Sequence, residues 1–167
     1  MSLPTTQIQK WEREQHLIST DTSLIPPDTL NDALGSDRMH WATRLSAEEL
    51  HVMVNSSVCF GLYDMTRETP AFFGFARLVT DRVTFVYLTD VWISEEREGQ
   101  GLGSWLIECV REWTEQMPNM RQLTLITGAG KKEEYYAKKL GTTRFEDIKP
   151  GLQAKCFVKP GPAGCFR

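Results

Sequence analysis

The stretch Glu98-Gly99-Gln100-Gly101-Leu102-Gly103 decides the fold of this chain. It follows an apolar run with strand character, Val83–Ile93, and opens a segment in which apolar residues recur at helical spacing. A glycine loop between a strand and a helix presents unpaired backbone N–H groups at the positive end of the helix dipole. Glycines also let an anion approach these amides without hindrance from side chains. The stretch therefore predicts a phosphate-binding site.

The spacing of the glycines narrows the choice of ligand. A dinucleotide-binding loop needs G-x-G-x-x-G, whereas this loop has G-x-G-x-G. A Walker loop needs lysine and then serine or threonine after its last glycine, where this chain has Ser104 and Trp105. The loop also follows an expected antiparallel meander in mid-chain. Both nucleotide interpretations fail, and a glycine-rich connection without a ligand remains as the alternative.

The residues before the loop predict two short helices and a series of antiparallel strands. Proline, glycine and a capping-box spacing mark the helix ends, and apolar or aromatic runs between turn residues mark the strands. The expected elements are a strand near His16–Ser19, a helix from Pro26-Pro27-Asp28 to Gly35, a helix after Ser46-Ala47-Glu48-Glu49, and strands at Val58–Tyr63, Phe72–Thr80 and Val83–Ile93.

The residues after the loop predict helices alternating with strands. Leu102, Leu106, Val110, Trp113 and Met117 recur at helical spacing and predict a helix of about four turns. A strand at Gln122–Thr127, a helix at Lys132–Leu140 and strands at Arg144–Ile148 and Leu152–Lys159 follow. The fold class is α/β (α+β), with a mixed, mostly antiparallel sheet of about seven strands and four helices.

Length and composition favour one domain that acts on a small molecule or peptide. We expect a single domain, residues 1–167, with a loose tail at 160–167. The net charge of −3 and the lack of a long apolar run give no reason to expect nucleic acid or membrane as a partner. The N-terminus lacks a signal-peptide core, so a cytoplasmic location is expected. The four cysteines and three histidines lack metal-ligand spacing, so no metal is expected.

Beyond these physical arguments, the loop resembles the signature of the GNAT superfamily of acyl-CoA-dependent acetyltransferases, Q/R-x-x-G-x-G/A. Gly101 and Gly103 match this pattern, while Glu98 occupies the Gln/Arg position and Arg97 precedes it. The segments 59–64, 74–81 and 87–91, with Trp41-Ala42 upstream, resemble a subgroup of small members whose substrates are mostly unassigned. The resemblance implies a GNAT fold with acetyl-CoA (CoA) bound by Val91, Trp92, Ile93, Glu98, Gly99, Gln100, Gly101, Leu102, Gly103 and Ser104.

The resemblance implies direct attack of an amine on the acetyl thioester, with a tyrosine as the acid for the departing thiolate. In the family pattern this tyrosine lies four residues before a glycine. Tyr136 lies five residues before Gly141, and Ala137 holds the strict position. Either the helix end has one extra residue or the acid is missing. Tyr135 is the fallback, and packing of both rings is the structural alternative.

The resemblance also implies a hydrogen-bond donor for the oxyanion that develops during acetyl transfer. It does not identify the general base for the amine. A bulge in the strand that ends near Ile93 would expose the backbone N–H of about Val91. Asp90 is the sole charged residue from Val83 to Ile93, and strand alternation places it with Leu88 and Trp92. It either binds a cationic amine, acts as a base through water, or pairs with an arginine such as Arg77.

The acceptor site and the activity itself also allow alternatives. Tyr87 occupies the place of the glutamate base of histone-type members, and Trp41, Tyr87 and Asp90 are the candidate acceptor-binding residues. Lys131 or Lys132 is a candidate contact for the adenosine phosphate. The predicted function is acetyl transfer to a primary amine of a small molecule or peptide, by a monomer or homodimer. A catalytically silent CoA-binding sensor protein is the alternative.

Overall fold

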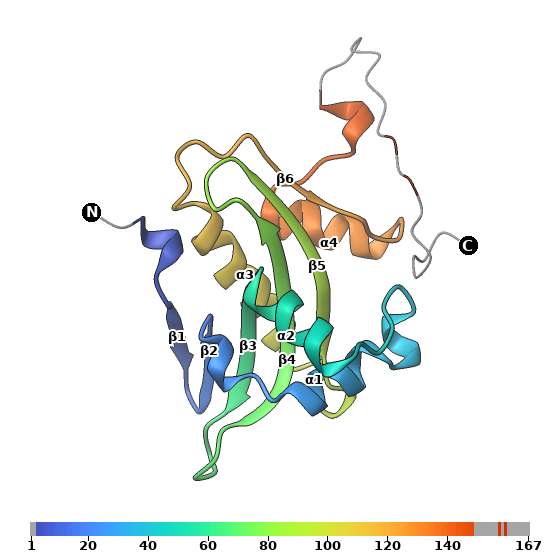
Figure 1. The fold of residues 1–167 in the computed structure, drawn as a ribbon. Helices are drawn as coiled ribbons and strands as arrows, with labels where there is room; N and C mark the ends of the chain where they lie inside the picture. The colour runs from blue at the N-terminus through green and yellow to red at the C-terminus, as the bar shows by residue number, and fades with distance from the viewer. Residues whose placement is uncertain (1–2, 149–156, 158, 160–167) are drawn as a thin grey trace.

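The computed structural model describes residues 3–148, 157 and 159 and contains a sheet of six strands in sequence order (Figure 1). The first five strands pair antiparallel, and β6 runs parallel to β5. The strands are β1 Lys10–Arg13, β2 His16–Ser19, β3 Val58–Asp64, β4 Ala71–Thr80, β5 Phe85–Ile93 and β6 Gln122–Leu125.

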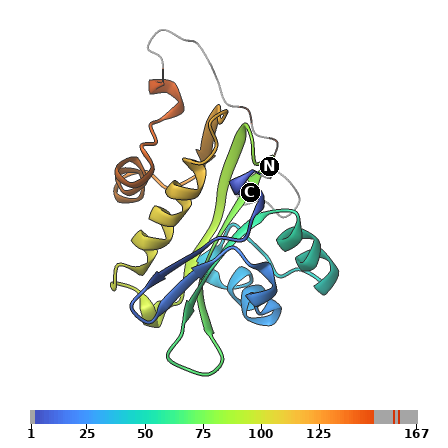
Figure 2. The ribbon, with the colours of Figure 1, turned by 90° about the vertical axis from the view of Figure 1, so that its left-hand side faces the viewer.

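In the described part of the chain, four α-helices cover the two faces of this sheet. Seen along its edge, α3 and α4 lie on one face and α1 and α2 on the other (Figure 2). The helices are α1 Pro27–Leu34, α2 Ala47–Asn55, α3 Leu102–Thr114 and α4 Lys131–Leu140. Short 3-10 helices lie at Pro4–Thr6, Thr22–Leu24, Asp37–Met39, Glu95–Arg97 and Phe145–Asp147.

The helix ends follow the capping signals of the sequence. Pro27 opens α1 and Gly35 follows its last residue. Before α2, the Ser46 hydroxyl accepts from the Glu49 N–H at 3.3 Å, and the Glu49 carboxylate accepts from the Ser46 N–H at 2.9 Å. This reciprocal pair is the capping box that the sequence predicts.

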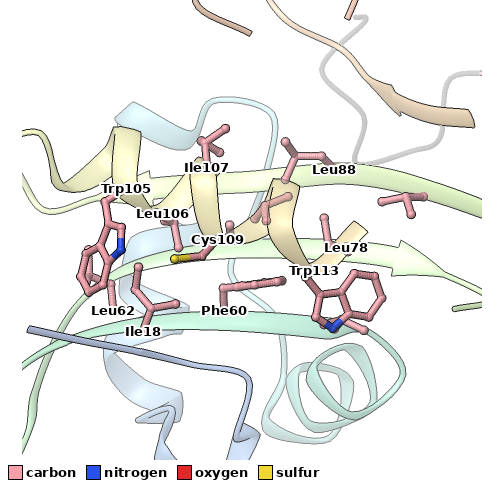
Figure 3. Close-up of a cluster of buried hydrophobic side chains, with 14 of the residues drawn as sticks. Ile18, Phe60, Leu62, Leu78, Leu88, Trp105, Leu106, Ile107, Cys109 and Trp113 are labelled. Carbon is pink, nitrogen blue, oxygen red and sulfur yellow. The ribbon is translucent and has the colours of Figure 1, made fainter. Parts of the chain in front are cut away.

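Two hydrophobic clusters, one on each side of the sheet, hold the layers together. The apolar face of α3 packs on the sheet, with Leu106 and Trp113 fully buried (Figure 3). Val110 of the same face is also fully buried. On the other side, α1 and α2 pack through Leu30, Leu34 and Leu50 against a second cluster. The periodicity that predicts α3 thus marks its buried face.

The structure corrects two predictions about strands. Arg144–Ile148, predicted as a strand, contains the 3-10 helix Phe145–Asp147, and the Arg144 guanidinium binds Glu133 of α4 instead of joining the sheet. The β1 strand was not predicted, because Trp11 is its sole apolar residue and the rest is exposed. Except for residues 157 and 159, the predicted strand Leu152–Lys159 lies outside the described residues, as does the predicted tail at 160–167. The described sheet has six strands rather than about seven.

Within the described part of the chain, no helix has the length and apolar character needed to cross a membrane. The same residues contain no group of three or more His, Cys, Asp or Glu side chains arranged to hold a metal ion.

Candidate active site

The glycine loop connects the 3-10 helix after β5 to the first turn of α3. Gly99 and Gly101 adopt left-handed backbone angles, with φ of 76° and 75°, and Gly101 is the N-cap of α3. The hydrogen bonds of the helix begin with the Trp105 N–H, which donates to the Gly101 carbonyl at 3.0 Å. The N–H groups of residues 102–104 precede this bond and are available to an anion.

Conformation, rather than lack of space, requires glycine at position 101. A Cβ atom there would meet no other atom within 4 Å. We expect Gly101→Ala to lower the free energy of unfolding by about 1 kcal/mol, since an L-residue is strained at positive φ. Gly103→Ala is the matched control. Its Cβ would make an ordinary 3.6 Å contact with Ile93, and alanine favours the helix by about 0.5–1 kcal/mol. Urea denaturation of both variants should therefore give shifts of opposite sign, and equal shifts would contradict this explanation.

The two charged side chains at the entrance of the loop, Arg97 and Glu98, form ion pairs with residues outside the loop. The Glu98 carboxylate accepts a hydrogen bond from Arg38, which places a positive charge next to it beside the loop. Arg97 binds Asp64 at 2.7 Å and lies over the Phe73 ring. Hydrogen bonds from Thr66, with a contribution from Arg97, lower the pKa of Asp64 to about 2. Arg97 is therefore engaged with Asp64 of β3.

Strand β5 contains a bulge where the sequence analysis expected an oxyanion donor. Phe75 pairs with Trp92 and Arg77 pairs with Thr89, so β5 has one more residue than β4 in this interval. Asp90 lies within the bulge with a φ of 51°, in the left-handed region. Strand β6 pairs with β5 only as far as Leu88, so beyond that residue the β6 side of β5 borders a cleft.

The bulge corrects the predicted orientation of Asp90. Strict alternation would place Leu88, Asp90 and Trp92 on one face, but Leu88 packs under α3 whereas Trp92 packs against the α1 and α2 cluster. Asp90 contacts Arg77 and Trp41. The extra residue of the bulge reverses the alternation between positions 88 and 92.

The Asp90 carboxylate is buried and accepts three hydrogen bonds. Arg77 donates from Nε to Oδ2 at 2.7 Å, and its Nη2 forms an ion pair with the same oxygen, also at 2.7 Å. Oδ1 accepts from Trp41 Nε1 at 3.2 Å and from the Thr89 hydroxyl at 3.3 Å. Asp90 is only 6% exposed and the Arg77 side chain 17%. Of the roles that the sequence left open for Asp90, pairing with Arg77 is the one present in the structure.

A cleft of about 890 Å³ brings all of the predicted catalytic and acceptor residues together. Its lining includes Trp41, Tyr87, Asp90, Val91, Trp92, Glu98, Lys132, Tyr135 and Tyr136. Residues 99–104 and Ile93 are not part of this lining. Leu102 is buried in the core under α3, and Ile93 is partly buried against the same core.

Other residues of the cleft were not singled out by the sequence. Arg38 lies 60 residues before its partner Glu98, so no local sequence pattern predicts this ion pair. His40 stacks edge-on against Trp41, with ring centroids 5.0 Å apart. Residues 126–128, which follow β6, form part of the wall opposite β5. In the sequence, the end of the predicted strand at 122–127 is the one feature that could have indicated the residues of that wall.

Both candidate tyrosines reach the cleft from α4. Their ring centroids lie 5.1 Å apart at an interplanar angle of 76°. Burial raises the pKa of Tyr136 to about 12, with a smaller contribution from Tyr135. Burial also raises the pKa of Tyr135, and a hydrogen bond with the Ser104 side chain partly opposes that shift. Helix α4 ends at Leu140, and Gly141 caps it with a φ of 68°.

These features define a class of protein. It has a mixed sheet in which two neighbouring parallel strands separate at a bulge, and a glycine loop that begins a helix lies next to this point. The model of the acetyltransferase (GNAT) family matches residues 11–141. The chain therefore belongs to the acetyltransferase (GNAT) family and has its α+β fold. It is an acyltransferase of a family that uses acetyl-CoA.

Relatives agree with this assignment. A Gibberella zeae protein named "Putative acetyltransferase" is 36% identical over 157 residues, which cover 86% of this chain and 88% of that protein. A GNAT-family protein of Xanthomonas campestris has a similar structure, with a TM-score of 0.68, 24% identity, and coverage of 88% of this chain and 96% of that one. A GNAT acetyltransferase of Elizabethkingia anophelis, solved with acetyl-CoA bound, has a TM-score of 0.50 and 16% identity over 79% of this chain and 78% of its own.

Proposed function

We propose that this chain transfers an acetyl group from acetyl-CoA to a primary amine of a small molecule or peptide by direct attack. The observation that carries the proposal is that the β5 bulge and the α4 tyrosines face one cleft, at the point where β5 and β6 part. The glycine loop lies at the start of α3, next to Glu98 of the same cleft.

The loop suits the pyrophosphate of the donor. The free N–H groups of residues 102–104 lie at the positive end of α3, whose first turn has no acidic residue. Pairing with Arg38 offsets part of the repulsion that Glu98 would exert on a phosphate. Lys132, at the start of α4, supplies a positive charge to the same cleft. Residues 91–93 and 98–104 are the proposed donor site.

Acetyl transfer requires a donor for the developing oxyanion and an acid for the thiolate. We assign the first role to the backbone N–H of Val91, since the bulge interrupts the ladder at this residue. We assign the second to Tyr136. A phenol whose pKa is about 12 stays protonated at neutral pH and can donate to the departing sulfur.

Asp90 acts in this proposal through the bulge, as a positioning residue. Its three hydrogen bonds, from Arg77, Trp41 and Thr89, hold a left-handed backbone that an unpaired side chain would not fix. Both carboxylate oxygens already accept these hydrogen bonds, so we assign no proton transfer to Asp90. An amine with a pKa near 10.4 is neutral in only about one part in 2,500 at pH 7, so loss of its proton costs about 4.6 kcal/mol. Water in the cleft is the proposed route for that proton.

Thiol release from acetyl-CoA with a panel of primary amines tests the proposal. We expect release that depends on the amine and yields an acetylated product of matching mass. Calorimetry with CoA is the companion measurement. Binding of CoA without turnover of any amine would contradict the proposal and favour the silent sensor, which Glu98 at the Gln/Arg position of the signature also suggests.

A further inference from the structure

The charged side chains that line the cleft indicate which kind of acceptor amine the cleft can bind. Among the described residues, the cleft has two carboxylates, Asp90 and Glu98, and each is already bound by an arginine. Lys132 and Lys159 bring the cationic side chains of the lining to four, counting Arg38 and Arg77. The lining therefore carries more positive than negative charge and has no unpaired carboxylate to bind an ammonium group.

The acceptor side of the cleft is built from aromatic and apolar side chains. Trp41, Tyr87 and Trp92 are partly exposed, and all three line the cleft. The indole nitrogen of Trp41 is used by Asp90, and Trp92 packs beside Phe72 with ring centroids 5.9 Å apart. Leu45 and Met53 continue this wall from the α1 and α2 side.

Such a wall suits an acceptor that is itself aromatic or apolar. Aromatic rings bind other rings through large apolar contacts. They also bind cations, but here the lining has two more cationic side chains than carboxylates, and this excess opposes a further positive charge. An amine that enters this cleft also loses solvation, which lowers its pKa and favours the neutral, reactive form.

We infer that the acceptor is a monoamine on an aromatic or apolar body, and not a polyamine or the lysine of a basic peptide. This inference rests on the proposed acetyltransferase function and specifies its substrate class. The amine forms an N–C bond with the acetyl carbonyl carbon as the C–S bond breaks. The proton that the amine loses is balanced by the one that the CoA thiolate gains.

The experiment compares kcat/KM for 2-phenylethylamine, spermidine and a Gly-Lys-Gly peptide blocked at its N-terminus, with acetyl-CoA as the donor. We expect 2-phenylethylamine to exceed the other two by at least about tenfold. A preference for spermidine or the peptide would overturn the inference and leave the proposed function standing. No turnover of any amine would overturn the proposed function, and the inference with it.

Two variants test the physical basis. Tyr87→Ala removes a ring from the wall, so KM for 2-phenylethylamine should rise about tenfold while the Kd for CoA stays unchanged. Val52→Ala, an exposed position on α2 outside the cleft lining, is the matched control and should leave both values unchanged. An unchanged KM in Tyr87→Ala would overturn the role of the aromatic wall.

Arg38→Gln tests the argument from charge, because it is expected to favour a cationic acceptor rather than to weaken an aromatic one. It frees the Glu98 carboxylate, so kcat/KM for spermidine should rise severalfold relative to 2-phenylethylamine. An unchanged ratio would overturn the argument that paired carboxylates exclude polyamines.

Discussion

Replacing Asp90 by alanine is expected to lower the free energy of unfolding by about 3–5 kcal/mol, because it leaves the Arg77 guanidinium uncompensated in a site where it is 17% exposed. The indole N–H of Trp41 loses its acceptor in the same substitution. Urea denaturation measures the loss. Asp32→Ala is a suitable control, since its ion pair with Arg44 is about 65% exposed and should contribute little.

Asp90→Asn separates the charge of this side chain from its shape. Asparagine can accept the Trp41 hydrogen bond and tolerates the φ of 51° found at this position. It should therefore be less destabilising than alanine. A stability of Asp90→Ala equal to that of the wild type would show that the buried ion pair does not hold the bulge.

The same two variants separate a positioning role of Asp90 from a role as the base. If Asp90 holds the bulge, Asp90→Asn should retain turnover within about tenfold and Asp90→Ala should lose much more, because the Val91 N–H is then misplaced. If Asp90 is the base, both variants should lose about 10²-fold or more while Asp90→Asn stays folded. Steady-state kinetics at matched folded fractions distinguishes the two.

The sequence predicts those parts of the fold that depend on local patterns. Helix α3 follows from the spacing of Leu106, Val110 and Trp113, and α2 follows from the Ser46 capping box. The left-handed turns of the loop follow from its glycines. In each case the residues that give the signal lie within a few positions of the structure that they specify.

The missed features depend on contacts between distant residues or on the backbone alone. A bulge adds one residue without changing the composition of a strand, so alternation wrongly placed Asp90 with Leu88. Arg38 and Glu98 are 60 positions apart, and their pairing requires the tertiary fold. The segment Arg144–Ile148 has enough apolar character for a strand, but its arginine binds α4.

Replacing Tyr136 by phenylalanine is expected to lower kcat by about 100-fold with little change in the Kd for CoA. The phenol donates its proton only as the C–S bond breaks, so its loss affects the transition state more than binding. The pKa of about 12 lies above the usual value of 10, so the acid form persists from neutral pH to well above pH 10. The wild-type kcat should therefore show no fall from tyrosine ionisation between pH 7 and 10.

Tyr135→Phe is the matched control, because it removes the same atom from the neighbouring ring. The Tyr135 hydroxyl bonds the Ser104 side chain in the first turn of α3. Its loss should therefore weaken CoA binding modestly and leave kcat near the wild-type value. Single-turnover rates at saturating acetyl-CoA separate the two effects. If Tyr135→Phe lost turnover and Tyr136→Phe did not, the acid would be Tyr135. The five-residue spacing from Tyr136 to Gly141 would then mark a true departure from the family pattern, instead of one extra residue at the end of α4.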